Sequence, residues 1–153
     1  MYTFDVINSI RKKCIDLLSN ISLEDANKIP EGFNNNIAWN FGHLVVSGYS
    51  LVFKATQADP NFQIPLVDKF RKGTKPEGFV TQDEINELIE LSNNFTLAVK
   101  EAWDAGRFNN ITSYTTETLG VPITTIEEMI TTVAIHDSIH SQVMRDFKRV
   151  LGR

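Results

Sequence analysis

The stretch TIEEMITTVAIHDSIHSQVMRDFKRVL, residues 125–151, carries a clear helical signal. It opens on Thr125 with Glu128 three positions later, a capping-box pattern that satisfies free backbone N–H groups at the start of a helix. The apolar residues that recur along one face of it are Ile126, Met129, Ile130, Val133, Val143, Phe147, Val150 and Leu151. Their steps of three and four follow one face of a helix, so the stretch predicts a long amphipathic helix.

Three earlier segments show the same periodicity. They run over about residues 3–19, 37–57 and 81–105. The second follows the asparagines Asn34 to Asn36, whose side chains are good acceptors for the N–H groups of a first helical turn. The third opens on Thr81 and Glu84, a second capping box, and stops before Gly106. The sequence therefore predicts four long helices.

Two connections between these helices are long. Residues 58–80 contain three prolines and two glycines, so we expect at most a short helical turn there, near residues 66–71. Residues 106–124 contain an alternation of Thr, Tyr and Ile, which predicts an extended segment or a small hairpin ending near Val121. Loops of this length in a compact domain are often functional.

The number and order of these elements predict the fold class. There is no alternation of strands with helices, which argues against an α/β sheet. We expect an all-α protein, with residues 1–153 forming a single domain: an antiparallel four-helix bundle with two long crossover loops.

Charge and hydropathy exclude several classes of partner. A formal net charge of −4 at pH 7 argues against general binding to nucleic-acid backbones. No apolar run approaches the roughly 18 residues of a membrane span. Asp5 precedes the first basic cluster, whereas a signal peptide places its basic residues first. We therefore expect a cytoplasmic protein that binds neither nucleic acid nor membranes.

Cys14 is the only cysteine, which excludes an intramolecular disulfide and any site built from several thiolates. It lies in an apolar series with the spacing of a buried helix face: Ile7, Ile10, Cys14, Leu17 and Leu18. A reactive thiol is the alternative interpretation. We expect core packing instead, because a free cysteine behaves as a small hydrophobe.

The chain has only three histidines, and their positions suggest a metal site. His136 and His140 are four residues apart on the fourth predicted helix, so their side chains lie on one face. That face includes Val133, Val143 and Phe147, which predicts that both imidazoles face the interior of the bundle. His43 lies on a face of the second predicted helix that can also point inward. Three histidines that leave a coordination position open are typical of a catalytic zinc site.

Other interpretations of these histidines remain open. An interior histidine is often only a hydrogen-bonded core residue. The segment His136-Asp-Ser-Ile-His140 is similar in spacing to the H-E-x-x-H metalloprotease motif, but Asp137 is one methylene shorter than the glutamate of that motif. We expect Asp137 to be partly exposed or to accept a hydrogen bond from an imidazole N–H.

Two segments, Asn36-Ile-Ala-Trp-Asn-Phe-Gly-His-Leu44 and His136-Asp-Ser-Ile-His140, resemble the DinB-like superfamily. Lys69-Phe-Arg-Lys-Gly-Thr-Lys-Pro76 and Gly120-Val-Pro-Ile-Thr-Thr-Ile-Glu-Glu128 also resemble its members, so the similarity covers nearly the whole chain. One departure from the family pattern is Gln142, where members often have glycine. A side chain of this size is expected to narrow the cavity or contact the substrate.

The resemblance implies a four-helix bundle, often a homodimer, with a divalent metal ion, zinc or nickel, on His43, His136 and His140. Relatives include S-transferases that use bacillithiol, mycothiol or glutathione, a thiol-dependent isomerase, and proteins labelled as metal-dependent hydrolases. It therefore implies an enzyme that activates a low-molecular-weight thiol or water for reaction with a small-molecule substrate. Further candidates for lining the site are Trp39, Asn40, Tyr114, Gln142 and Arg145.

Two other functions remain open. One is a metal-binding stress-response or sensor bundle without catalysis. The other is a purely structural bundle in which the histidines are core residues. The basic segment from Lys69 to Lys75 is interpreted as solvated, or at most as a binding site for an acidic thiol cofactor.

Overall fold

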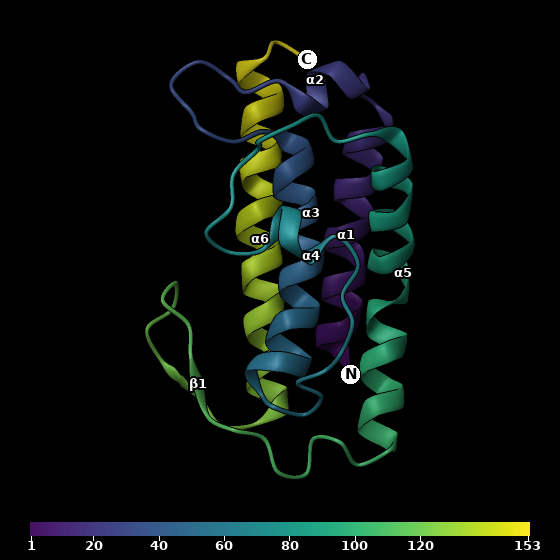
Figure 1. Ribbon diagram of the computed structural model, residues 1–153, viewed down its shortest axis with the longest axis vertical. Helices are drawn as coiled ribbons and strands as arrows, with labels where there is room; N and C mark the ends of the chain where they lie inside the picture. The colour runs from purple at the N-terminus through teal and green to yellow at the C-terminus, as the bar shows by residue number, and fades with distance from the viewer.

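A computed structural model describes all residues, 1–153, and is mostly helical (Figure 1). Its helices are α1 (Tyr2–Ser19), α2 (Leu23–Asn27), α3 (Ile37–Tyr49), the π-helix η1 (Ser50–Ala55), α4 (Val67–Phe70), α5 (Gln82–Asp104) and α6 (Ile126–Val150). Its strands are β1 (Tyr114–Thr115) and β2 (Pro122–Ile123), which form a two-stranded antiparallel sheet. The all-α class is confirmed.

The predicted helix starts are confirmed by their caps. The side chain of Asn36 accepts a hydrogen bond from the backbone N–H of Trp39 at the start of α3. Thr81 and Thr125 each form a complete capping box with the glutamate three residues later. These local hydrogen bonds satisfy N–H groups that a helix leaves without a partner in its first turn.

The long helices pack side by side around a common core. α1 and α3 each pack against both α5 and α6. α1 and α6 run in one direction, and α3 and α5 run in the other (Figure 1). α3 is the most buried of the four, since only Ser47 among its residues is not buried. It therefore brings His43 into the interior, opposite α6.

The connections differ in part from the prediction. The segment from η1 to α5 runs the length of the molecule and contains α4, as expected for a crossover (Figure 1). The segment from α5 to α6 instead joins two helix ends that lie at the same end of the molecule (Figure 1). It folds into the small β1–β2 hairpin, in which Tyr114 faces Ile123. Only one of the two expected crossovers is therefore present.

Several smaller features complete the fold. The helix predicted over about residues 37–57 covers both α3 and η1, but sequence periodicity indicated neither the π-helical form of η1 nor the short helix α2. Cys14 is buried, which confirms its placement in the core, and burial raises the pKa of its thiol. None of the helices is both long enough and apolar enough to cross a lipid bilayer.

Candidate metal centre

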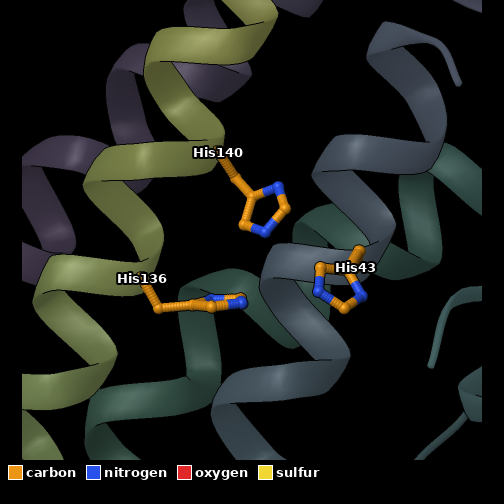
Figure 2. A group of neighbouring side chains, drawn as sticks. All are labelled: His43, His136 and His140. Atoms are coloured by element: carbon orange, nitrogen blue, oxygen red, sulfur yellow. The ribbon is translucent and has the colours of Figure 1, made fainter. Parts of the chain in front are cut away.

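The three histidines come together between two helices. His43 lies on α3, and His136 and His140 lie on α6, with all three rings turned toward one another (Figure 2). The ring centroids are 4.7 Å apart for His43 and His140, and 4.5 Å apart for His136 and His140. One nitrogen from each ring lies within 4.8 Å of the others, so the three residues could hold a metal ion.

His43 is held on two sides. Its Nδ1 lies 2.8 Å from the carbonyl oxygen of Phe70, the last residue of α4. A carbonyl can only accept, so Nδ1 carries the proton and the Nε2 lone pair remains available. The indole of Trp39 stacks on the imidazole, with ring centroids 4.8 Å apart. The crossover segment that contains α4 therefore fixes both the orientation and the tautomer of this ring.

Gly42 permits this contact between α4 and α3. A Cβ atom at position 42 would collide with the ring of Phe70. The absence of a side chain therefore allows Phe70 to pack directly against the backbone of α3, one residue before His43. This glycine is needed for close approach and not for an unusual backbone angle, since it lies within a regular helix.

His140 is oriented by a buried amide. Its Nδ1 lies 2.8 Å from Oδ1 of Asn40, which is 1% exposed. The amide nitrogen of Asn40 donates to Oδ1 of Asn35 and to the carbonyl oxygen of Asn36, both at 2.8 Å. Those two bonds direct the amide oxygen toward His140, so Nδ1 of His140 donates and its Nε2 lone pair remains available.

The environment keeps two of the imidazoles neutral at physiological pH. Burial is the main cause that lowers the pKa of His43 to about 4 and that of His140 to about 3, from an ordinary value of 6.5. The neighbouring imidazoles lower both values further, because positive charges so close together repel. A neutral imidazole is the form that ligates metals.

The donor set fits a divalent transition metal. Neutral imidazole nitrogens suit several such metals, and two of the three rings present Nε2 because Nδ1 is already hydrogen-bonded. His136 lies next to them with a buried Nδ1 that has no hydrogen-bond partner. Each of the three residues thus offers one ligand atom to the same point.

The histidines open onto a cavity of about 410 Å³. Its wall includes Ser47, Ser50 and Leu51, which continue the His43 side of α3 into η1. π-helical turns are frequent at functional sites, and this one contributes to the wall of the cavity. The volume is that of a site for a small molecule.

The mouth of the cavity is formed by two connecting segments. Arg71 and Lys72 come from the crossover after α4, and Tyr114 and Glu117 come from the β1–β2 hairpin. Lys72 Nζ lies 2.6 Å from a carboxylate oxygen of Glu117, which ties the two segments together across the mouth. This neighbouring ammonium group holds the pKa of Glu117 below its ordinary value. Both long loops therefore contribute to the site.

Three of the additional candidates from the sequence lie at the site. Trp39 and Asn40 contact the histidines directly, and Tyr114 lines the cavity. Gln142 does not line the cavity, contrary to expectation. Its side chain is exposed and bonds to Asp146 and Arg145, because residue 142 lies on the outer face of α6. Arg145 is likewise exposed and away from the histidines.

Asp137 is not partly exposed, so the first of the two expectations for this residue is wrong. The residue is fully buried, at 0% exposure, and its Oδ2 accepts a hydrogen bond from Nε of Arg11 at 2.7 Å. Sequence reasoning missed Arg11, although a signal was present: Arg11 is four residues after Ile7 and three before Cys14 on the buried face of α1. A charged residue at a core position calls for a buried partner.

Fold and site together define a helical protein with a candidate three-histidine metal centre beside a small-molecule cavity. The chain belongs to the DinB superfamily, whose family model matches residues 8–144. The matched range includes all three histidines and both segments at the mouth of the cavity. No curated protein matches the chain.

Proposed function

We propose that this protein is a divalent-metal-dependent enzyme that activates a low-molecular-weight thiol or water at its three-histidine site. The reaction would be an S-transfer or a hydrolysis on a small molecule. The main support for this proposal is that His43, His136 and His140 lie close together in the wall of one open cavity. Membership in the DinB superfamily supports it.

The chain's own residues prepare the site before any ligand binds. Phe70 and Asn40 accept from the Nδ1–H groups of His43 and His140, so that both rings present an Nε2 lone pair. A divalent ion such as zinc or nickel held by these nitrogens and by His136 would supply Lewis acidity, which lowers the pKa of a thiol or water. The low pKa values of His43 and His140 keep the ligand atoms of these two residues deprotonated at neutral pH.

The cavity suits a polar small molecule. Ser47, Ser50 and Tyr114 offer hydroxyl groups along the wall, and Arg71 brings a positive charge to the mouth. The thiol in an S-transfer would come from a diffusible co-substrate, because Cys14 is 1% exposed and is not among the residues that line the cavity. We place this reaction in the cytoplasm.

We extend the proposal to the architecture of the protein. Residues 1–153 form one domain, an antiparallel four-helix bundle, and two copies associate as a homodimer. The packing of α1 and α3 against both α5 and α6 supports the bundle. Static light scattering on purified protein tests the dimer, and a mass of one chain would contradict it.

The first experiment is metal analysis of the purified protein. We expect close to one zinc or nickel ion per chain, with loss of most of it in His136→Ala and in His140→Ala. We also expect the bound ion to raise the melting temperature of the wild-type protein relative to protein treated with a chelator, because it binds only the folded state. Unchanged metal content in both variants would show that the ligand assignment is wrong.

A second candidate function is metal binding without catalysis, as in a sensor. One observation favours it: the only carboxylate in the cavity wall, that of Glu117, is engaged by Lys72, so no free general base faces the histidines. Metal-loaded protein should be assayed with several low-molecular-weight thiols against a panel of electrophiles, and with ester and amide substrates for hydrolysis. Turnover lost in His136→Ala supports the enzyme, whereas bound metal with no turnover supports the sensor.

A further inference from the structure

An ion pair is buried beside the metal centre. Nε of Arg11 on α1 lies 2.7 Å from Oδ2 of Asp137 on α6, and the two side chains are 2% and 0% exposed. The guanidinium group stacks over the ring of Phe95, 4.1 Å from its centroid. Gly48 on α3 makes room for it, because a Cβ there would lie 2.6 Å from Nη2. Three helices besides α1 thus shape the space around one charged side chain.

Stability alone does not explain this pair. Taking two charges out of water is costly, and apolar replacements of similar size are often neutral or stabilising. The pair is also incompletely satisfied, since Nη1 and Nη2 of Arg11 and Oδ1 of Asp137 have no hydrogen-bond partner. A buried carboxylate with one free oxygen is therefore left next to His136.

The free oxygen of Asp137 complements an atom of His136. His136 Nδ1 lies 4.0 Å from Oδ1 of Asp137, and both atoms are buried without a hydrogen-bond partner. His43 and His140 each have an acceptor at Nδ1, and His136 lacks one. The separation exceeds a hydrogen bond, but such contacts are often long in ligand-free sites and shorten on binding.

We propose that Asp137 and Arg11 are positioning residues that fix the tautomer of His136. Arg11 donates to Oδ2 and thereby directs Oδ1 toward His136, where it accepts from Nδ1–H and leaves Nε2 as the ligand atom. An anionic acceptor at this place also makes the imidazole a better ligand. This inference rests on the proposed function, because it assigns the pair its role at the same three-histidine site.

The variant Asp137→Asn tests the tautomer directly. Arg11 can only donate, so it takes the amide oxygen of the new side chain. The amide nitrogen then faces Nδ1 of His136 and donates to it, which places the imidazole proton on Nε2. This is the wrong tautomer for a ligand, although the volume of the side chain is almost unchanged.

The first readout uses metal-free protein and is independent of metal binding. Long-range ¹H–¹⁵N correlation spectra of ¹⁵N-histidine-labelled protein distinguish protonated from unprotonated ring nitrogens, and three histidines give few signals to assign. We expect Nδ1–H at His136 in the wild type and Nε2–H in Asp137→Asn. An Nε2–H tautomer in the wild type, or the same tautomer in both proteins, would overturn the inference whatever the metal affinity proves to be.

The second readout is zinc affinity, measured by competition with a chromophoric chelator. We expect Asp137→Asn to weaken binding by about 10–100-fold, the usual effect of removing a partner that orients a ligand. The matched control is Asp146→Asn, the same chemical change on the exposed face of the same helix, which should leave the affinity unchanged. Equal zinc affinity in wild type and Asp137→Asn would contradict the inference while leaving the proposed function intact.

A double variant separates positioning from a structural role and covers the case in which Asp137→Asn does not fold. Arg11→Met with Asp137→Leu replaces the pair by apolar side chains and is expected to keep the melting temperature in chelator. It should still bind zinc about 10–100-fold more weakly than the wild type. Wild-type zinc affinity in this variant would show that the pair does not act on His136. Absence of zinc binding by the wild type itself would instead refute the proposed function.

Discussion

At the residue scale, only one orientation of the Asn40 side-chain amide satisfies the hydrogen bonds to its neighbours. Its nitrogen has two acceptors within 2.8 Å, Asn35 Oδ1 and the Asn36 carbonyl, so its oxygen must face His140. A buried amide with all its groups paired is costly to disturb, because each lost bond leaves another buried group without a partner. Orientation of His140 therefore depends on the loop that precedes α3.

We predict that Asn40→Ala weakens zinc binding by about 10-fold or more, because His140 loses the acceptor that fixes its tautomer. Chelator competition measures the change. Asn94→Ala, the same substitution at an exposed position of α5, is the control and should bind zinc like the wild type. If both variants bind zinc with wild-type affinity, the orienting role of Asn40 is wrong.

At the element scale, the crossover between η1 and α5 acts through the contact of α4 with α3. α4 has only four residues, from Val67 to Phe70, and is too short to be stable by itself. It is held in place because the ring of Phe70 is fully buried against Gly42 and its carbonyl oxygen bonds to His43. A short helix in a loop thus becomes part of the three-histidine site.

We predict that Gly42→Ala lowers the free energy of unfolding by about 1–3 kcal/mol, since the added methyl collides with the Phe70 ring. The sign of this change in the free energy of unfolding is informative. Without a collision, alanine in place of glycine inside a helix would stabilise the protein by about 1 kcal/mol. Urea unfolding measures the change, with Gly78→Ala as a control at which nothing lies within 4 Å of the new Cβ. Unchanged or increased stability in Gly42→Ala would contradict the close packing of α4.

At the scale of the whole molecule, burial of the histidines couples stability to pH. His43 and His140 have pKa values of about 4 and 3 in the folded protein, against an ordinary value of 6.5. At pH values between the folded-state pKa values and 6.5, these two histidines bind protons in the unfolded chain but not in the folded protein. The free energy of unfolding therefore rises with pH across this range. The contribution of the two histidines to the free energy of unfolding is fully present above about pH 6.5. It is lost as the pH falls toward their pKa values in the folded protein.

We predict that metal-free protein loses stability from pH 6.5 to 4.5, at up to about 1.4 kcal/mol per pH unit for each of the two histidines. Glutamates such as Glu84 and Glu128 have pKa values lowered from 4.5, so their effect falls mostly below this range. Urea unfolding in the presence of a chelator gives the slope. The variant His43→Gln with His140→Gln should show a much flatter profile, and an equal slope in both proteins would contradict this origin.

Much of the fold could be predicted because its signals are local. The capping boxes at Thr81 and Thr125 need only residues three positions apart, and the helix faces need only regular spacing. The i, i+4 spacing of His136 and His140 likewise predicted a shared face. In the structure the two rings are only partly buried and lie beside the core positions of α6, which Val133, Asp137 and Met144 occupy.

Four amphipathic helices and their starts could be predicted from the sequence alone, because short-range hydrogen bonds and periodicity specify them. The three histidines could be identified there only as candidate metal ligands. Tertiary structure alone decided how each ring is held. The carbonyl of Phe70 reaches His43 across 27 residues, Asn40 reaches His140 across 100, and Arg11 reaches Asp137 across 126. Such contacts depend on how helices pack, and side-chain periodicity along one helix carries no information about which residue of another helix will face it.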